Sequence, residues 1–308
     1  MRFNRLRAVG ATLAALAMVA GACGKSGGSS ATSTSTTAAA KPTISIGSEK
    51  FSESIIVAEI YAKALENKGY TVTRKYRLGT REVYEPALER GEIDLVPDYA
   101  ATLLEFVNKN AGEATPDATA TVAKLRERLA AKSLTALDPS TALDANAFGV
   151  TKATADKYNL KKLSDLTPLA SQFVLGAPPE CPTRAFCGAG LEKVYGLKFK
   201  SFKALDFDGP LTKAALKSGD IQVGELSTTD ADTSFVILDD DKHLQNADVL
   251  TPIIRNDKAT AEVKTILNAV SAKLITSDLA VLDKRADVDK EDPDVVGAGW
   301  AKDHGFSK

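Results

Sequence analysis

The sequence contains few of the residues on which catalytic and metal sites depend. Only two histidines, one tryptophan and three cysteines occur among its 308 residues. His243 lies in a charged stretch with no nucleophile beside it, and no G-x-S-x-G, H-E-x-x-H or glycine-rich phosphate-binding motif is found. These absences argue against an enzyme and give no indication of a bound metal or cofactor.

An excess of charge of one sign is also lacking. The 39 basic and 40 acidic residues nearly cancel, and 44% of the chain is hydrophobic, which is typical of a globular protein. Because no strongly basic surface is indicated, nucleic acid is not an expected partner. The acidic runs 206–209 and 238–241 lack the EF-hand spacing for calcium and are interpreted as solvated turns.

Long apolar runs are confined to the N-terminus. Three arginines precede the apolar stretch 8–22, which is too short for a permanent span of a ~30 Å bilayer and is typical of a secretory signal. The stretch ends in AGAC, similar to the lipobox that directs cleavage before, and lipid attachment to, Cys23. The alternative is an ordinary signal peptide with an incidental cysteine. We expect residues 1–22 to be removed and 23–42 to form a lipidated, flexible tether.

The two remaining cysteines, Cys181 and Cys187, enclose the five residues PTRAF. An even number of cysteines in an exported protein favours a disulfide. A zinc-binding pair is the alternative, but neither His243 nor His304 has ligand spacing to these cysteines.

From residue 42 onward, strand and helix patterns alternate. TISIG (43–47) is predicted to be a strand, and 51–70 repeats apolar residues at helical spacing before Gly69. A strand over 71–79 and a helix capped by Thr80 follow. The alternation continues through the helical patterns 100–109 and 117–132. It is repeated in the second half of the sequence by the segments 172–177, 191–197, 199–205, 210–219, 221–226 and 234–238. The order predicts an α/β fold with mainly parallel strands.

One pattern occurs twice. LERGEIDLVPDY (88–99) and LKSGDIQVGELS (216–227) each contain a helix end, a glycine, an acid, an isoleucine and a short strand. A chance match of two common units is the alternative. If the repeat is structural, two similar lobes present Tyr99 and Ser227 at the carboxyl ends of strands, where open α/β sheets bind ligands.

These segments, together with GSEKFSES, the RLGT turn, CPTRAFC and FVILDDDKHLQ, resemble the substrate-binding proteins of osmoprotectant ABC importers over about 43–303. The resemblance implies a two-lobed, periplasmic-binding-protein-like (type II) α/β fold that closes at a hinge of two crossing strands, here near 147–150 and 249–255. Residues 43–147 with 250–308 are then expected to form the first lobe, and 148–249 the second.

The family holds a ligand carboxylate with polar groups and a quaternary ammonium in a cage of tyrosines, whose ring faces attract a cation. Carried over by position, the resemblance implies that Tyr99 is a cage residue, Thr102 a polar contact and Arg184 the carboxylate-binding residue. The basic residue expected in the first turn is shifted, so that Lys50 stands beside Glu49 at its place. Tyr99 as a core residue and Arg184 as an exposed charge are the alternatives.

The other cage positions depart from the family pattern. The tyrosine expected two residues after Asp144 is Asn146, and two more are replaced by Ser227 and Asp248. These four residues are predicted to contact the ligand, and their oxygens suit a cation with N–H donors as well as a quaternary one. An alignment shifted by one residue, or a surface position, is the alternative for Asp248.

The resemblance implies an extracytoplasmic, lipid-anchored, monomeric receptor. It would capture a small, cationic, carboxylate-bearing solute such as a glycine betaine-like osmoprotectant and deliver it to an ABC permease. The membrane would be contacted through the lipid alone, and no cofactor or metal is expected. An envelope hydrolase on a similar scaffold, and a receptor of the same fold for an amino acid or a polyamine, are the alternatives.

Overall fold

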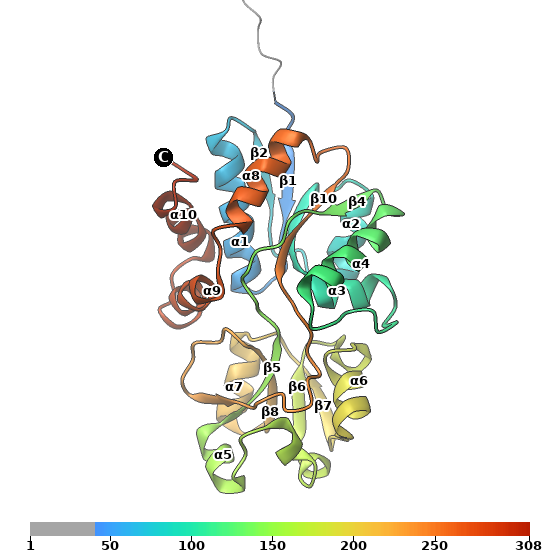
Figure 1. Ribbon diagram of the computed structural model, residues 1–308. Helices are drawn as coiled ribbons and strands as arrows, with labels where there is room; N and C mark the ends of the chain where they lie inside the picture. The colour runs from blue at the N-terminus through green and yellow to red at the C-terminus, as the bar shows by residue number, and fades with distance from the viewer. Residues whose placement is uncertain (1–40) are drawn as a thin grey trace, which may run out of the picture. The chain divides into compact units, whose positions relative to one another are not determined.

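The structure, a computed structural model, describes one unit of the chain, residues 41–308 (Figure 1). The predicted signal segment, most of the tether and Cys23 lie outside the described residues. The strands of this unit divide between two five-stranded sheets, and helices pack against each sheet. We call each sheet with its helices a lobe.

The first sheet has the strand order β2-β1-β3-β10-β4. Its strand β1 pairs in parallel with β2 and β3, whereas β10 runs antiparallel to β3 and β4. The bounds are Ile44–Gly47 for β1, Val72–Lys75 for β2, Leu95–Tyr99 for β3, Leu134–Ala136 for β4 and Leu250–Arg255 for β10.

The second sheet repeats this arrangement with the order β7-β6-β8-β5-β9. Its strand β6 pairs in parallel with β7 and β8, and β5 runs antiparallel to β8 and β9. The bounds are Asn146–Thr151 for β5, Val174–Ala177 for β6, Ser201–Ala204 for β7, Val223–Ser227 for β8 and Phe235–Ile237 for β9. Each sheet therefore has two parallel and two antiparallel strand pairings. The prediction of mainly parallel strands was wrong on this point.

The sequence repeat has a structural counterpart, because β3 and β8 are the central strands of their sheets. Each follows a helix that ends near a glycine with a positive φ, 75° at Gly91 and 81° at Gly219, which only glycine adopts without strain. Tyr99 and Ser227 are the last residues of the two strands.

The helices of the first lobe begin with α1, which lies against α8 and α10. Gly297 permits the close approach of α10, since a Cβ at this position would lie 2.4 Å from the carbonyl oxygen of Ile56. The helices of this lobe are α1 (Ser52–Asn67), α2 (Arg81–Glu89), α3 (Ala100–Val107), α4 (Ala118–Ala130), α8 (Ala261–Ser271), α9 (Thr276–Asp283) and α10 (Pro293–Asp303).

The helices of the second lobe are shorter. They are α5 (Lys152–Tyr158), α6 (Gly188–Gly190) and α7 (Pro210–Ser218), with 3-10 turns at Leu163–Leu166, Ala170–Gln172 and Cys181–Thr183. Within the segment 191–197 the residues Leu191–Tyr195 form a π-helical turn, and a second π turn, Lys284–Val288, follows α9 in the first lobe. The helix α6 and the turn after it follow the Cys181–Cys187 disulfide.

Two predicted local features differ from the structure. The strand expected over 71–79 is limited to β2, because Arg77 adopts a left-handed backbone with φ of 61° that interrupts an extended chain. Thr80 does occupy the N-cap of α2, but its hydroxyl donates to Glu82 (2.6 Å) instead of accepting a backbone N–H.

The chain passes between the sheets twice, just ahead of β5 and just ahead of β10. The two passing segments touch: Leu143 and Val249 form an antiparallel bridge, and the amide of Asp144 donates to the carbonyl of Asp248 (3.3 Å). Both crossing segments therefore run side by side, and they bring Asp144 and Asp248 to the space between the lobes.

Candidate functional site

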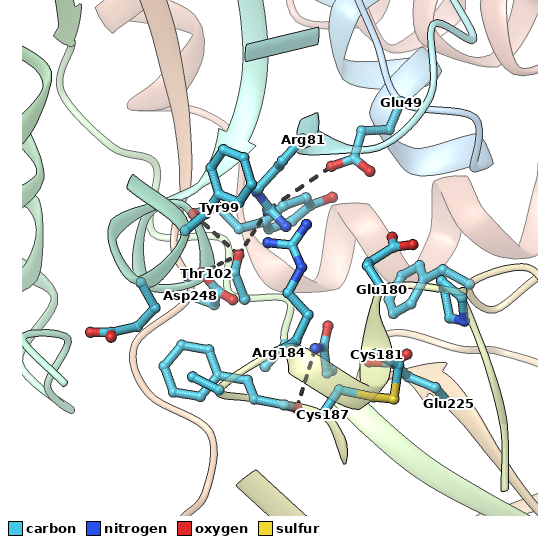
Figure 2. Close-up of a pocket in the computed structure, with 18 of the residues that line it drawn as sticks. Glu49, Arg81, Tyr99, Thr102, Glu180, Cys181, Arg184, Cys187, Glu225 and Asp248 are labelled. Atoms are coloured by element: carbon cyan, nitrogen blue, oxygen red, sulfur yellow. Dashed lines mark hydrogen bonds and ion pairs between the residues drawn. A yellow bond between two sulfur atoms is a disulfide. The ribbon is translucent and has the colours of Figure 1, made fainter. Parts of the chain in front are cut away.

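A cavity lies between the lobes, at the carboxyl ends of β3 and β8 (Figure 2). Its volume is about 80 Å³, several times the space that one water molecule needs. A wider cavity of about 760 Å³ adjoins it, and Glu49, Phe51, Glu180 and Phe207 line both. We call these the inner and the outer cavity.

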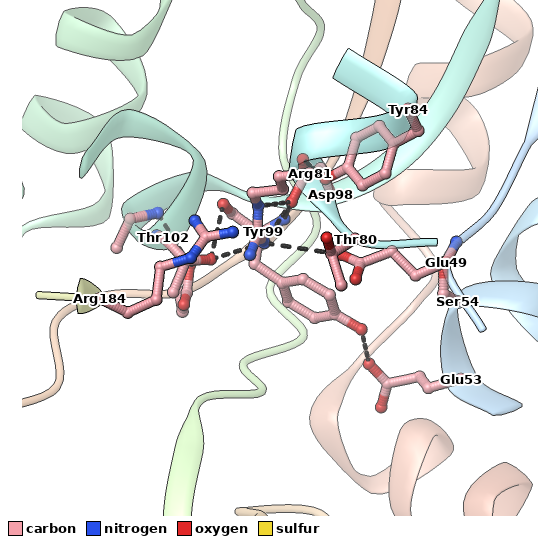
Figure 3. Close-up of polar contacts among 12 residues, drawn as sticks. Glu49, Glu53, Ser54, Thr80, Arg81, Tyr84, Asp98, Tyr99, Thr102 and Arg184 are labelled. Atoms are coloured by element: carbon pink, nitrogen blue, oxygen red, sulfur yellow. Dashed lines mark hydrogen bonds and ion pairs between the residues drawn. The ribbon is translucent and has the colours of Figure 1, made fainter. Parts of the chain in front are cut away.

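Arg81, the first residue of α2, is part of the cavity wall that the first lobe forms. Its guanidinium donates to Asp98 through Nε (3.1 Å) and Nη2 (2.5 Å), and Nη2 also donates to the hydroxyl of Thr102 (2.8 Å). Tyr84 donates a further hydrogen bond to Asp98. These contacts, shown in Figure 3, hold Arg81 and Thr102 in place, and they neutralise Arg81 with a buried carboxylate.

Tyr99 lines the inner cavity, and 6% of its surface is exposed. Its hydroxyl donates to buried Glu53, and burial, followed by the negative charge of Glu53, raises its pKa well above the ordinary value. The ring of Phe51 lies 6.2 Å from that of Tyr99 and 5.2 Å from that of Phe207 in the second lobe. Three aromatic rings from both lobes therefore line one side of the cavity.

Asp248 fixes the start of α3. Its Oδ1 accepts the backbone N–H groups of Ala101 (2.8 Å) and Thr102 (3.0 Å), which the helix itself leaves unbonded. The residue is 3% exposed, and burial raises its pKa to about 7, although the Thr102 amide and Arg81 act in the opposite direction. Asp248 thus lines the inner cavity while serving as a helix cap.

The wall from the second lobe includes the loop closed by the Cys181–Cys187 disulfide. Arg184 extends from this loop toward Arg81 and Thr102 (Figure 2). Its Nη2 donates to both carboxylate oxygens of Glu82 in α2 (2.8 and 3.0 Å), and its guanidinium lies 4.8 Å from the ring centre of Phe106 in α3. Arg184 therefore joins the two lobes across the cavity.

The outer cavity is strongly acidic. Asp144 accepts hydrogen bonds from Ser227 (2.5 Å) and Thr228 (2.9 Å), and the hydroxyl of Thr229 donates to Asp283 of the first lobe (2.9 Å). Burial raises the pKa of Asp144. Eight carboxylates line this cavity against one basic side chain, Lys50: they belong to Glu49, Glu53, Asp144, Glu180, Asp206, Asp208, Asp283 and Asp287. Such a surface attracts cations.

The residues proposed from the resemblance fall in two groups. Lys50 is exposed and, like Ser227, lines only the outer cavity. The others line the inner cavity: Tyr99, Thr102, Asp144, Asn146, Arg184 and Asp248. Asn146 donates to the carbonyl of Phe186 (3.4 Å).

Several cavity residues were not identified from the sequence. Arg81 begins an ordinary-looking helix, and Phe51 and Phe207 are 156 positions apart, so nothing local indicates that their rings meet. Glu225 could have been identified from the sequence, since it is the one acid in the otherwise uncharged segment IQVGELS. This segment contains the buried strand β8.

The zinc alternative for the cysteines does not fit the structure. The sulfur atoms of Cys181 and Cys187 and a carboxylate oxygen of Glu225 lie within 4.8 Å of one another, as metal ligands would. The two sulfurs are joined in a disulfide, however, and a disulfide offers no thiolate to zinc.

Among residues 41–308 no single helix is long and apolar enough to cross a membrane. Only a bent pair, Ala261–Ser271 with Thr276–Val288, reaches the necessary length and composition, and its two parts meet at 78°. Buried residues from both parts belong to the core of the first lobe.

The fold and site define a class: a two-lobed α/β protein with a ligand-sized space between its lobes. A family model described as the substrate-binding domain of ABC-type glycine betaine transport systems matches residues 42–303, and the chain belongs to this family. It is therefore an extracytoplasmic substrate-binding protein of an ABC transporter.

Individual relatives agree with this assignment. A glycine-betaine-binding protein of Pseudomonas aeruginosa is 25% identical over 86% of this chain and 89% of its own length. The glycine betaine-binding protein YehZ of Escherichia coli is also 25% identical, over 88% and 93%. A crystal structure described as a glycine betaine/carnitine/choline ABC transporter superposes with a TM-score of 0.66 at 25% identity, covering 86% of this chain and 99% of that one. These relatives are solute-binding proteins, so the hydrolase alternative is not favoured.

Proposed function

We propose that this chain captures a small ammonium solute of the glycine betaine, carnitine or choline kind between its lobes and delivers it to an ABC permease. The observation that carries the proposal is the inner cavity, where the rings of Phe51, Tyr99 and Phe207 lie beside carboxylates and two arginines. Aromatic faces and negative charge attract an ammonium group, and an arginine can hold a carboxylate.

The proposal includes the arrangement of the lobes. Residues 43–147 with 250–308 would move as one lobe and 148–249 as the other, about the paired segments at Leu143 and Val249. The pair of Arg184 and Glu82 supports a closed state, because it connects the lobes directly. In this state the solute would be enclosed, and the permease would receive it when the lobes separate.

The location is proposed from the N-terminal sequence. Cys23 after small residues supports a lipid anchor, with residues 24–41 as the tether between the membrane and the binding unit. We also propose that the receptor acts as a monomer, since the cavity is formed by one chain.

Calorimetric titration of the purified protein with glycine betaine, carnitine and choline tests the function. We expect saturable binding of one solute per chain, with the solute recovered unchanged. An exported chain that binds none of these compounds, or converts one of them, would contradict the proposal.

A further inference from the structure

The most unusual side chain of the inner cavity is Glu225. It is the third residue of β8, a strand that is buried throughout, and only 3% of its surface is exposed. Strand alternation places it on the same face as Ser227, toward the space between the lobes. Within residues 41–308 its carboxylate has no hydrogen-bond or ion-pair partner, although it lines the cavity.

The six carboxylates of the inner cavity, Glu225 included, separate into two sets. Three have structural partners: Asp248 caps α3, Asp144 accepts hydroxyl groups, and Glu105 accepts the backbone amides of Gly112 and Ala114 (both 2.7 Å). The other three, Glu225, Glu180 and Glu49, accept no hydrogen bond from the described residues through their side chains. The nearest cation to Glu49 is Arg81, at 4.0 Å.

Folding does not account for Glu225, which is the one buried member of this set, since Glu49 and Glu180 are only partly buried. Burial of a carboxylate without a partner costs several kcal/mol, and the cost is reflected in the pKa of Glu225, which burial and then Glu180 raise to about 8 against the opposing effect of Arg184. The two arginines of the cavity are already bonded to other acids, Arg81 to Asp98 and Arg184 to Glu82. The unpartnered acceptors therefore face a space that is suited to an additional cation.

We propose that Glu225, together with Glu180 and Glu49, accepts N–H hydrogen bonds from the cationic end of the solute, so that the preferred solute is an incompletely methylated ammonium compound. This inference rests on the proposed function and specifies its ligand. A quaternary nitrogen has no N–H group, so it would leave the lone pairs of a buried carboxylate unbonded. Methyl groups that remain on the nitrogen would contact the rings of Phe51 and Phe207.

The alternative role for Glu225 is that of a hydrogen-bond donor instead of an acceptor. In its protonated form the carboxyl group would donate a hydrogen bond to a carboxylate of the solute. The two roles differ in their response to Glu225→Gln, because a glutamine amide replaces a protonated acid as a donor but does not supply negative charge. They also differ in proton exchange, since binding of a cation would displace a proton from Glu225, whose pKa is raised, and donation by the protonated carboxyl group would not.

The test compares two matched pairs of solutes by calorimetric titration at pH 7. N,N-dimethylglycine and dimethylethanolamine carry one N–H in place of one methyl group of glycine betaine and choline, respectively. We expect the N–H member of each pair to bind at least about tenfold more tightly, since a hydrogen bond to a charged group is worth about 1.5–3 kcal/mol. Titration in two buffers of different ionisation enthalpy should show net proton release.

Glu225→Gln should remove this preference, because both kinds of solute lose the attraction of the negative charge but the N–H compounds also lose a hydrogen bond, so their loss of affinity should be at least about tenfold greater than that of glycine betaine and choline. Glu92→Gln is the matched control, because Glu92 is exposed on the first lobe and lines neither cavity. Tighter binding of the quaternary members, or full retention of affinity in Glu225→Gln, would overturn the inference and leave the proposed function intact. Absence of binding by all four compounds would overturn both.

Discussion

Arg184 and Glu82 form an ion pair that crosses the cavity between the lobes. The pair is asymmetric in its surroundings, since 17% of the Arg184 side chain is exposed against 48% of the Glu82 side chain. The arginine can therefore serve the enclosed solute, whereas the glutamate is partly solvated. This difference allows the two possible roles of Arg184, lobe contact and solute contact, to be separated by mutation.

If Arg184 holds a carboxylate of the solute, Arg184→Ala should weaken binding of glycine betaine or dimethylglycine by roughly 2–4 kcal/mol, because a desolvated carboxylate loses its charged partner. Glu82→Gln should cost less than about 1 kcal/mol, as expected for a partly exposed ion pair. Calorimetric titration measures both. Equal losses in the two variants would mean that Arg184 acts only as a contact between the lobes.

The hydroxyl of Tyr99 should matter for stability as well as for binding. Tyr99→Phe removes the hydrogen bond to Glu53, which is 4% exposed, so we expect the free energy of unfolding to fall by about 1–3 kcal/mol. Urea denaturation gives the value. Tyr158→Phe is the control, since the hydroxyl of Tyr158 has no hydrogen-bond partner among the described residues. Equal stability of Tyr99→Phe and wild type would refute the structural role.

The solute-free protein should lose stability as the pH rises from about 5 to 8. Burial raises the pKa of Glu225 to about 8 and those of Glu49 and Asp248 to about 7, whereas in the unfolded chain these groups ionise near pH 4. Between these values the native state binds more protons, so the free energy of unfolding decreases by up to ~1.4 kcal/mol per pH unit for each group.

Urea denaturation at several pH values checks this slope. Glu225→Gln should make it shallower, and Glu92→Gln should leave it unchanged because Glu92 lines neither cavity. A free energy of unfolding that increases over this range would show that the three carboxyl groups are ionised in the native state at pH 5.

Cys23→Ala should release the protein from the membrane, because the proposed lipid is attached to that residue alone. Fractionation of cells that express the two forms provides the measurement. A substitution of Ser30 in the tether serves as control. Recovery of Cys23→Ala in the membrane fraction at the wild-type level would contradict the anchor.

The alternation of strands and helices could be predicted because each element has a local pattern. The segment 51–70 carries helical spacing and a terminal glycine, and β3 and β8 follow nearly identical helix ends. The disulfide was also predictable, since only two cysteines remain once Cys23 is assigned to the lipid.

The cavity could be predicted only where the family resemblance indicated a position. Glu225 became notable only when the structure showed that no described residue bonds to its carboxylate. Phe51 and Phe207 belong to different lobes, and their contact depends on how the lobes close rather than on any local pattern. Asp248 is a further case: its cap on α3 joins residues 146 positions apart.

The matching strand orders of the two sheets give the molecule an internal pseudo-symmetry. Equivalent positions end β3 and β8, yet one is an aromatic side chain, Tyr99, which lines the inner cavity, and the other a hydroxyl, Ser227, which lines the outer cavity. An unsymmetrical solute would otherwise encounter two similar walls. We expect the divergence at this pair of positions to orient the solute, because its two ends would meet different side chains.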